Sequence, residues 1–159
     1  MKHTLSVLVE NKPGVLARIA GLFRRRGFNI HSLAVAPTEN PNLSKMIIVV
    51  DLEDKPLEQV EKQLHKLINV IKIQDFLPHE AVERELALIK VKATKENRSE
   101  IIQIADIFRA KIVDVSQDSL AIEVTGTEDK IDAIVALLKP YQIIDIARTG
   151  KIAVARGKK

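Results

Sequence analysis

Hydrophobic and polar positions alternate along the chain in an order that occurs twice. Leu5, Val7 and Val9 alternate with Ser6, Leu8 and Glu10, which predicts a strand, and the turn residues Asn11-Lys12-Pro13-Gly14 end it. The next apolar residues fall at i, i+3, i+4 and i+7 and predict an amphipathic helix with one buried stripe, formed by Leu16, Ile19, Ala20 and Phe23.

Gly27 is placed to end this helix, and a strand is expected from Phe28 to Ala36. The apolar residues of that strand change phase part-way along it, which predicts a β-bulge. Met46 to Val50 is a continuous apolar run, typical of an inner strand. Asp54 and Pro56 are expected to open a second helix, whose apolar stripe is Leu57, Val60, Leu64 and Leu67.

A fourth strand at Val70, Ile71 and Ile73 completes the order strand, helix, strand, strand, helix, strand, which then recurs. The second copy comprises a strand over Glu85 to Ala93, a helix with the stripe Ile101, Ile104, Ala105 and Phe108, a hairpin of Lys111 to Val115 with Leu120 to Thr125, a helix capped by Thr127 with the stripe Ile131, Ile134, Val135 and Leu138, and a strand from Ile143 to Ala147. The likeness of residues 19–24 to residues 104–109 supports a duplication.

This order predicts an α+β protein of two ferredoxin-like βαββαβ units. Each unit is expected to hold a four-stranded antiparallel sheet with its helices on one face. The junction is expected between Leu77 and Val82, which divides the chain into residues 1–77 and 78–159. The basic tail from Arg148 to Lys159 is expected to fray or to dock on a partner.

Composition narrows the class of protein. With 159 residues, a hydrophobic fraction of 46% and a formal net charge of only +4, the chain is expected to fold into one ordinary domain or two small ones. It contains no cysteine, which excludes disulfides and thiolate chemistry and fits the cytoplasm. Its apolar runs stay well below about 18 residues, so neither a signal peptide nor a membrane span is expected.

Catalytic patterns are not found in the sequence. The histidines His3, His31, His65 and His79 lie in four different predicted elements without the spacing of metal ligands. The chain carries no glycine-rich phosphate loop followed by a lysine and a hydroxyl residue. Glu83 and Glu85 are interpreted as a solvated strand face in preference to an acid/base pair. We therefore expect no catalytic residue, no metal ligand and no cofactor on this chain.

Binding of RNA is an alternative, because four-stranded sheets of this order also carry RNA. Aromatic residues make up only 3% of the chain, and the two middle strands show no exposed aromatic side chain for stacking. The run Arg24-Arg25-Arg26 is interpreted as a solvated helix end that complements the helix dipole. Nucleic acid is therefore not the expected partner.

The segment that joins the first strand to the first helix predicts a small-molecule site. Pro13 lacks an N–H group, and Gly14 has no side chain to block a ligand. The backbone N–H groups of Gly14, Val15 and Leu16 are expected to point outward at the positive end of the helix, where a carboxylate would bind. On these residues alone, a plain capped turn remains the alternative interpretation.

Two further features favour binding of a free amino acid, whose ammonium group needs oxygen acceptors such as those of Asn11 and Asn29. Asn29 is a polar residue in an apolar strand start, and a two-fold partner could carry it to the other chain's Asn11 loop. The equivalent turn of the second unit, residues 94–98, has neither proline nor glycine. Only the first unit is expected to bind.

These residues resemble an ACT domain, on Leu5 to Glu10, Asn11 to Leu16 and Phe23 to Ile30. More narrowly, the chain is similar over nearly its whole length to the regulatory small subunits of acetolactate synthase. Further matching segments are residues 26–30, 32–38, 61–67 and 83–85 and the pair Phe108-Arg109.

The resemblance implies a non-catalytic subunit that activates a large, thiamine-diphosphate-dependent catalytic subunit and makes it sensitive to valine in branched-chain amino-acid synthesis. Thiamine diphosphate, Mg and FAD are expected on that partner. The resemblance also implies a homodimer through ACT domains at residues 1–77. Valine would lie between two of them, held by Asn11, Pro13, Gly14, Val15 and Leu16 of one chain and Asn29 and Ile30 of the other. An ACT-type sensor of a different enzyme shares these arguments and differs only in its partner.

Overall fold

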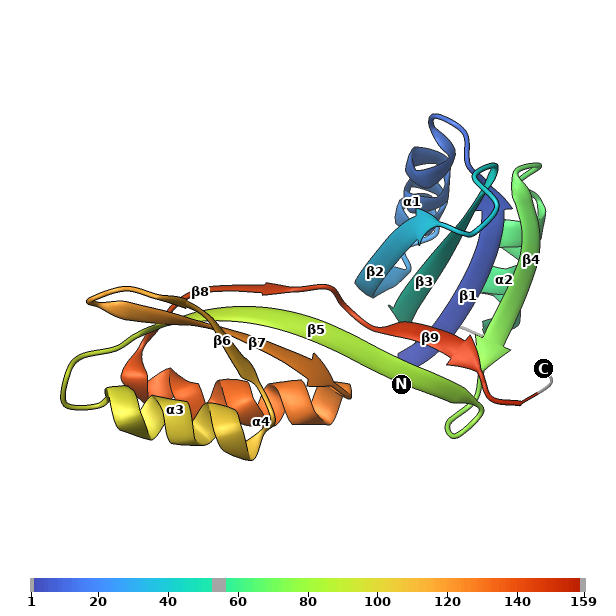
Figure 1. The fold of residues 1–159 in the computed structure, drawn as a ribbon. Coiled ribbons are helices and arrows are strands. Elements are labelled where there is room, and N and C mark those ends of the chain that lie inside the picture. The colour runs from blue at the N-terminus through green and yellow to red at the C-terminus, as the bar shows by residue number, and fades with distance from the viewer. Residues whose placement is uncertain (1, 53–56, 158–159) are drawn as a thin grey trace. The chain divides into compact units, whose positions relative to one another are not determined.

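The computed structural model describes residues 2–52 and 57–157, which form two compact units. The first unit comprises the described residues up to 82 together with those from 151 onward, and the second comprises residues 83–150 (Figure 1). Apart from a short strand at Ile152–Ala155 and a 3-10 turn at Lys139–Tyr141, the order of strands and helices is the one that the sequence predicts. Asp54 and Pro56, expected to open the second helix, lie outside the described residues.

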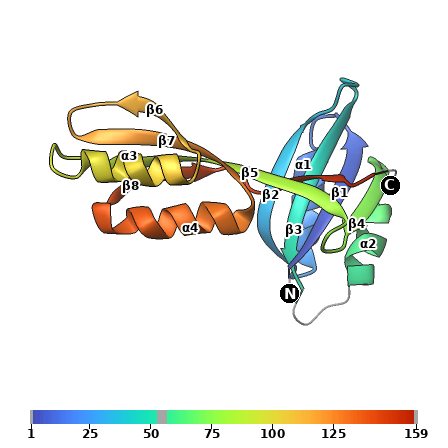
Figure 2. The same cartoon turned by 60° about the horizontal axis from the view of Figure 1, so that its bottom comes forward.

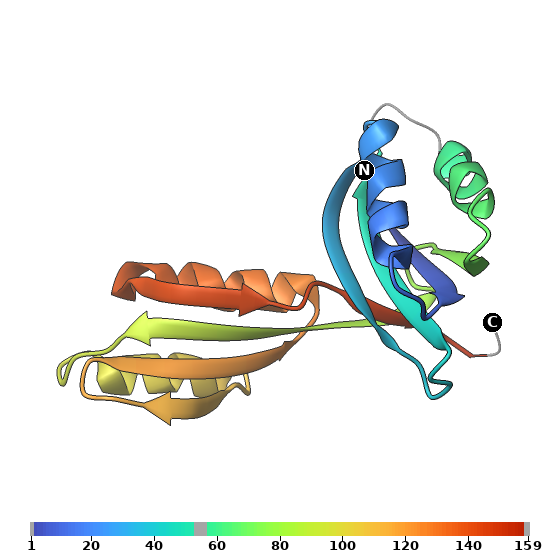
Figure 3. The same ribbon diagram turned by 90° about the horizontal axis from the view of Figure 1, so that it is seen from above.

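The first unit is built on an antiparallel sheet in the order β2-β3-β1-β4. Its strands are β1 (Lys2–Glu10), β2 (Asn29–Pro37), β3 (Leu43–Asp51) and β4 (Val70–Phe76). Helices α1 (Val15–Arg25) and α2 (Leu57–His65) lie on one face of this sheet (Figure 3). The predicted β-bulge is confirmed, because the pairing of β2 with β3 shifts register between Ile30 and Ser32.

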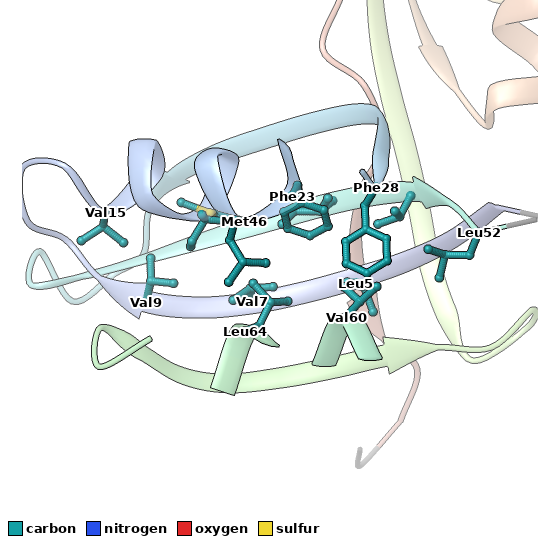
Figure 4. Packing of buried hydrophobic residues seen from close by; sticks show 14 residues of the cluster. Leu5, Val7, Val9, Val15, Phe23, Phe28, Met46, Leu52, Val60 and Leu64 are labelled. Carbon is teal, nitrogen blue, oxygen red and sulfur yellow. The ribbon is translucent and has the colours of Figure 1, made fainter. Parts of the chain in front are cut away.

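The core of the first unit lies between the sheet and its two helices (Figure 4). The predicted alternation in β1 is confirmed, since Leu5, Val7 and Val9 are all buried on the helix side. The predicted stripe of α1 is half wrong. Ile19 and Phe23 are buried as expected, but the other core positions of this helix are Val15 and Leu22, while Leu16 is 42% exposed. The predicted and the observed apolar stripes both have the period of a helix, and packing of α1 onto the sheet decides which of the two is buried.

Gly27 ends α1 as the sequence predicts, with a positive φ of 68°. The N–H of Gly27 donates to the carbonyl of Arg24 at 3.2 Å, and that of Phe28 donates to Phe23 at 3.0 Å. These two bonds form a Schellman motif, and the rings of Phe23 and Phe28 complete it by an edge-to-face contact with centroids 5.9 Å apart. This closure directs the chain from the helix into strand β2.

The opposite face of β3 is covered by the C-terminal part of the chain. Strand β9 (Ile152–Ala155) pairs with β5 (Ala81–Lys92), and Ala153 packs in a small cluster with Ile47, Phe76 and Ala81. Figure 1 and Figure 3 show β9 on the side of the first sheet away from α1 and α2. Ile47 is therefore buried, and the prediction of an inner strand at Met46 to Val50 is confirmed.

The prediction that the tail frays is wrong for Ile152–Ala155, which form strand β9. Docking of the tail on a partner stays a prediction. The small side chain of Ala153, 5% exposed, lets β9 approach the sheet closely. The predicted domain of residues 78–159 and the structural units consequently differ at the C-terminus, because the residues from 151 onward contact the first unit.

The second unit repeats the ferredoxin-like arrangement on a sheet in the order β6-β7-β5-β8, to which β9 adds a fifth strand through β5. Its remaining elements are α3 (Arg98–Ile107), β6 (Lys111–Val115), β7 (Ser119–Gly126), α4 (Glu128–Leu138), a short 3-10 turn η1 (Lys139–Tyr141) and β8 (Ile143–Arg148). Helices α3 and α4 cover one face, as Figure 1 and Figure 2 show. Thr127 caps α4 as predicted, accepting a hydrogen bond from the Lys130 N–H.

Glu85 is not on a solvated face, which corrects its interpretation from sequence. The residue is 5% exposed, and its carboxylate accepts a hydrogen bond from Nε of Arg148 on β8. Arg148 also donates through Nη1 to Asp132 of α4 at 2.8 Å. The guanidinium therefore links strands β5 and β8 of the second sheet to helix α4. It also neutralises a carboxylate that would otherwise be buried alone.

Removal of this cation is expected to destabilise the chain. We predict that Arg148→Ala lowers the free energy of unfolding by about 2 kcal/mol, because it leaves the Glu85 carboxylate buried and unpaired, an effect moderated by the partial exposure of Arg148. Urea denaturation followed by circular dichroism measures the change. Lys90→Ala, an exposed position on the same strand β5, is the control, and an equal loss in both variants would contradict the assignment.

Candidate functional site

The turn between β1 and α1 is held in place by the β2–β3 hairpin. The backbone N–H of Asn11 donates to the carbonyl of Asn42 at 2.7 Å, and its side-chain Nδ2 donates to the carbonyl of Pro41 at 2.9 Å. The side-chain oxygen Oδ1 of Asn11 makes no hydrogen bond with any described residue. Asn11 is thus anchored through its nitrogens and keeps a free acceptor.

Gly14 is the N-cap of α1 and adopts a left-handed conformation, with φ 83° and ψ −7°. No side chain caps this helix start. Among the described residues, none accepts a hydrogen bond from the backbone N–H of Gly14, Leu16 or Ala17. These donors lie at the positive end of the helix dipole, so they can bind an anion.

Two details of this turn differ from the sequence prediction. The N–H of Val15 is not free, because it donates to the carbonyl of Lys12 at 3.4 Å, and the Val15 side chain is buried in the core. Pro13 lies outside the first turn, since the helix begins at Val15. A third free donor, on Ala17, was not expected from the sequence, because the start of the helix decides which N–H groups are left over.

The second unit braces the equivalent turn with its own side chains, although no side chain caps the start of α3 either. The N–H of Thr94 donates to Oδ1 of Asn97 at 2.7 Å, and the N–H of Asn97 donates to Oγ1 of Thr94 at 3.3 Å. Arg98 at the first helical position donates to the carbonyls of Ser116 and Gln117. This turn is tied together by reciprocal bonds, whereas the turn at Gly14 has none of them.

Charges around the first turn are paired locally. Lys12 Nζ lies 2.5 Å from Oε2 of Glu10, and this hydrogen bond holds the pKa of the Glu10 carboxyl below its usual range. One turn into α1, Arg18 donates through Nη1 to Oδ1 of Asn69 at 2.8 Å. The backbone carbonyl of Asn69 accepts from the Glu10 N–H at 2.9 Å. The lysine is thus engaged by its neighbour, which leaves the helix donors as the anion-binding groups of this turn.

Asn69 is a supporting residue that the sequence did not indicate. It is 9% exposed and links β1 to α1 from the turn before β4. The hydrogen bonds that fix it join residues 51 and 59 positions apart, from Asn69 to Arg18 and to Glu10. The sequence shows only an asparagine in the turn before β4, and neither its burial nor its hydrogen-bond partners can be inferred from that.

Asn29 and Ile30 lie at the other end of the same sheet. Asn29 is opposite Asp51, and Asp51 is opposite Lys2 at the start of β1, whereas the Asn11 turn follows the end of β1. The nine residues of β1 separate the two ends by roughly 26 Å. One chain therefore brings Asn11, Gly14, Val15 and Leu16 together but not the other two predicted residues. Asn29 is exposed, and Ile30 packs partly against the core of its own unit.

The part of the chain described by the structure holds no group of three or more His, Cys, Asp or Glu side chains that could bind a metal ion. Within those same residues, none of the helices has the length and apolar character needed to cross a bilayer.

Comparisons with known proteins agree over both units. Residues 84–157 match the family model "Small subunit of acetolactate synthase", and residues 5–72 match that of the "AHAS small subunit-like ACT domain". The chain is 60% identical over 159 residues to a probable acetolactate synthase small subunit of Archaeoglobus fulgidus, covering 100% of this chain and 99% of that protein. It is 59% identical over 155 residues to the small subunit of Mycolicibacterium smegmatis, covering 98% and 91%.

A solved structure has the same fold over the full length. The crystal structure of the acetolactate synthase small subunit from Thermotoga maritima superposes with a TM-score of 0.92 at 47% sequence identity, covering 100% of this chain and 99% of that one.

Proposed function

The chain belongs to the family of acetolactate synthase small subunits, and we propose that it makes the enzyme sensitive to valine through a site formed between two copies of its first unit. It is a regulatory subunit of that enzyme complex. In the proposal it raises the turnover of the large catalytic subunit, which carries thiamine diphosphate, Mg and FAD in the cytoplasm. The observation that carries the proposal is the set of free N–H donors at the uncapped start of α1.

Two copies can complete the site if their β2 strands pair antiparallel. β2 is an edge strand of the first sheet. It runs from Asn29, opposite Asp51, to Pro37, opposite Ser44, so its Pro37 end lies at the same end of the sheet as the Asn11 turn. In an antiparallel two-fold pair, Asn29 of the partner subunit lies beside Pro37. The partner's Asn29 is thereby carried to the end of the sheet where α1 begins.

The chemistry of such a pocket suits a free amino acid. The N–H groups of Gly14 and Leu16, with that of Ala17, would bind the carboxylate at the helix dipole. Oδ1 of Asn11, which makes no hydrogen bond with residues 2–52 or 57–157 of its own chain, would accept from the ammonium group together with Asn29 of the partner subunit. The half-exposed Leu16 side chain and the partner's Ile30 would contact the isopropyl group. Pro13, which precedes the helix, would restrict the backbone conformation of the turn.

Affinity in this pocket has a physical ceiling. A ligand as small as valine gains about 5–8 kcal/mol, which corresponds to micromolar to sub-millimolar affinity. Free amino acids in this range can then act as a signal. Discrimination against alanine rests on a few methyl-sized contacts of about 1–3 kcal/mol each, so neighbouring aliphatic amino acids are expected to bind more weakly. Because the site needs two chains, valine binding and dimerisation are thermodynamically linked.

Reconstitution with the cognate catalytic subunit tests the proposed function. We expect the purified chain to bind the catalytic subunit and to raise its turnover, and valine to reverse that activation at micromolar to sub-millimolar concentration. Pull-down and steady-state rates of acetolactate formation measure the two effects. Absence of both binding and activation would overturn the proposal, and activation without any response to valine would overturn its effector part.

A charge at Gly14 is expected to remove the valine response. A side chain at this position meets nothing within 4 Å. The left-handed backbone strains any side chain there, but Asp and Asn adopt it more readily than other non-glycine residues, and both variants carry the same strain. We predict that Gly14→Asp raises the valine concentration for half-inhibition about a hundredfold, because its carboxylate lies against that of the ligand.

Gly14→Asn is the matched control, since it has nearly the same shape without the charge, and a shift below about tenfold is expected. Both variants should activate the catalytic subunit as the unchanged chain does. Equal half-inhibition in Gly14→Asp and the unchanged chain would exclude this turn as the carboxylate site.

Cross-linking tests the pairing of the β2 edges. The chain has no cysteine, so single cysteines introduced at Ser32, Leu33 or Ala34, near the middle of β2, report only their own contacts. A disulfide requires Cα atoms within about 7 Å of each other. We expect at least one of these variants to form a covalent dimer under mild oxidation. Ile71→Cys, on the opposite edge strand β4, should stay monomeric on a denaturing gel, and the reverse pattern would contradict the model.

A further inference from the structure

A hollow of about 280 Å³ lies on the face of the first sheet that carries no helix. Its floor is formed by Ser6 and Leu8 of β1, and Lys45 of β3 and Lys72 of β4 line it from either side. Leu8 is opposite Lys45 in one pairing and opposite Lys72 in the other. Directly opposed residues point to the same face, so both lysines flank Leu8 with their Cα atoms about 10 Å apart.

Both ammonium groups are unpaired within residues 2–52 and 57–157. Neither Lys45 nor Lys72 forms an ion pair or a hydrogen bond with a described residue. Lysines on a sheet commonly pair with acidic residues on neighbouring strands, but the residues directly opposite them here are Leu8 and, for Lys45, Ala36. Both positive charges therefore act on the same hollow, and the sheet that forms its floor shields them from bulk water on that side.

Ser6 supplies a hydroxyl donor to the hollow. The residue lines the hollow, and its hydroxyl makes no hydrogen bond with any residue that the structure describes. The hydroxyl is therefore free to donate to a ligand that enters the hollow. Beside it, Gln74 of β4 also lines the hollow and offers a side-chain amide. A bound oxygen atom would satisfy the hydroxyl.

We propose that this hollow binds a small free oxyanion, a phosphate or a carboxylate, between Lys45 and Lys72 with the Ser6 hydroxyl as donor. Glu39 lines the same hollow and leaves it with a formal charge of +1. This charge favours an anion of one or two charges over a polyphosphate. The site differs from the α1 turn in its residues and lies on the opposite face of the sheet, so it does not depend on the proposed valine response.

Titration of the full-length chain with inorganic phosphate at constant ionic strength tests the site. We expect saturable chemical-shift changes at the backbone amides of Ser6, Lys45 and Lys72 in NMR spectra. Lys45→Gln and Lys72→Gln should each weaken phosphate binding about tenfold, because each removes a charge-assisted hydrogen bond. Ser6→Ala should weaken it several-fold, and it keeps the fold because alanine fits the same place in the strand.

Lys62→Gln is the control, since it removes an equal charge from exposed α2 on the helix side of the sheet, and it should leave the affinity unchanged. Shifts that stay linear with phosphate, or that weaken equally in Lys62→Gln, would overturn the proposal and indicate only a diffuse ionic effect. The proposal is also overturned if the Lys45 and Lys72 variants bind phosphate normally but no longer bind the catalytic subunit, because the hollow would then receive an acidic side chain of that subunit.

Discussion

Backbone donors at the start of α1 have no acceptor among the described residues, and the proposed sensor depends on this. Gly14 lacks the side chain with which Thr94 and Asn97 close the equivalent turn of the second unit. Unpaired N–H groups at a helix start lower stability unless water or a ligand accepts their hydrogen bonds. Duplication thus yields one unit whose first turn is braced by its own side chains and one whose first turn, with glycine at the N-cap, is left open to an anion.

A second constraint is the length of the first sheet. Asn29 and the Asn11 turn lie at opposite ends of it, so a pocket that uses both must be shared between two chains. Regulation by such a pocket follows from mass action, because a ligand that binds only the paired state also stabilises the pair. Selectivity remains modest for a ligand of this size, so a response over a range of aliphatic amino acids is the physical expectation.

The fold was largely predictable because its signals are local. Gly27 ends α1 through hydrogen bonds that span six residues, and the alternation in β1 needs only its own strand. The remaining features depend on partners far along the chain. Glu85 is buried because Arg148 reaches it, and Asn69 is fixed by Glu10 and Arg18. Of the site, the residues of the first turn could be named from sequence. The start of the helix then decided the donors, because the N–H of Val15, predicted to be free, is bonded to Lys12, and that of Ala17 has no acceptor among the described residues.

The return of β9 to the first unit affects how the protein is made. Ile47, Phe76 and Ala81 leave the ribosome long before Ala153 does, so during translation this apolar surface stays open while the whole second unit is synthesised. The chain thus leaves the first unit through β5 and returns to it through β8 and β9, so the second unit is inserted into the sequence of the first. If the chain were cut between its units, the apolar surface of Ile47, Phe76 and Ala81 would stay exposed. A protein fused to the C-terminus would lie close to strand β9 and could disturb its packing on the first sheet.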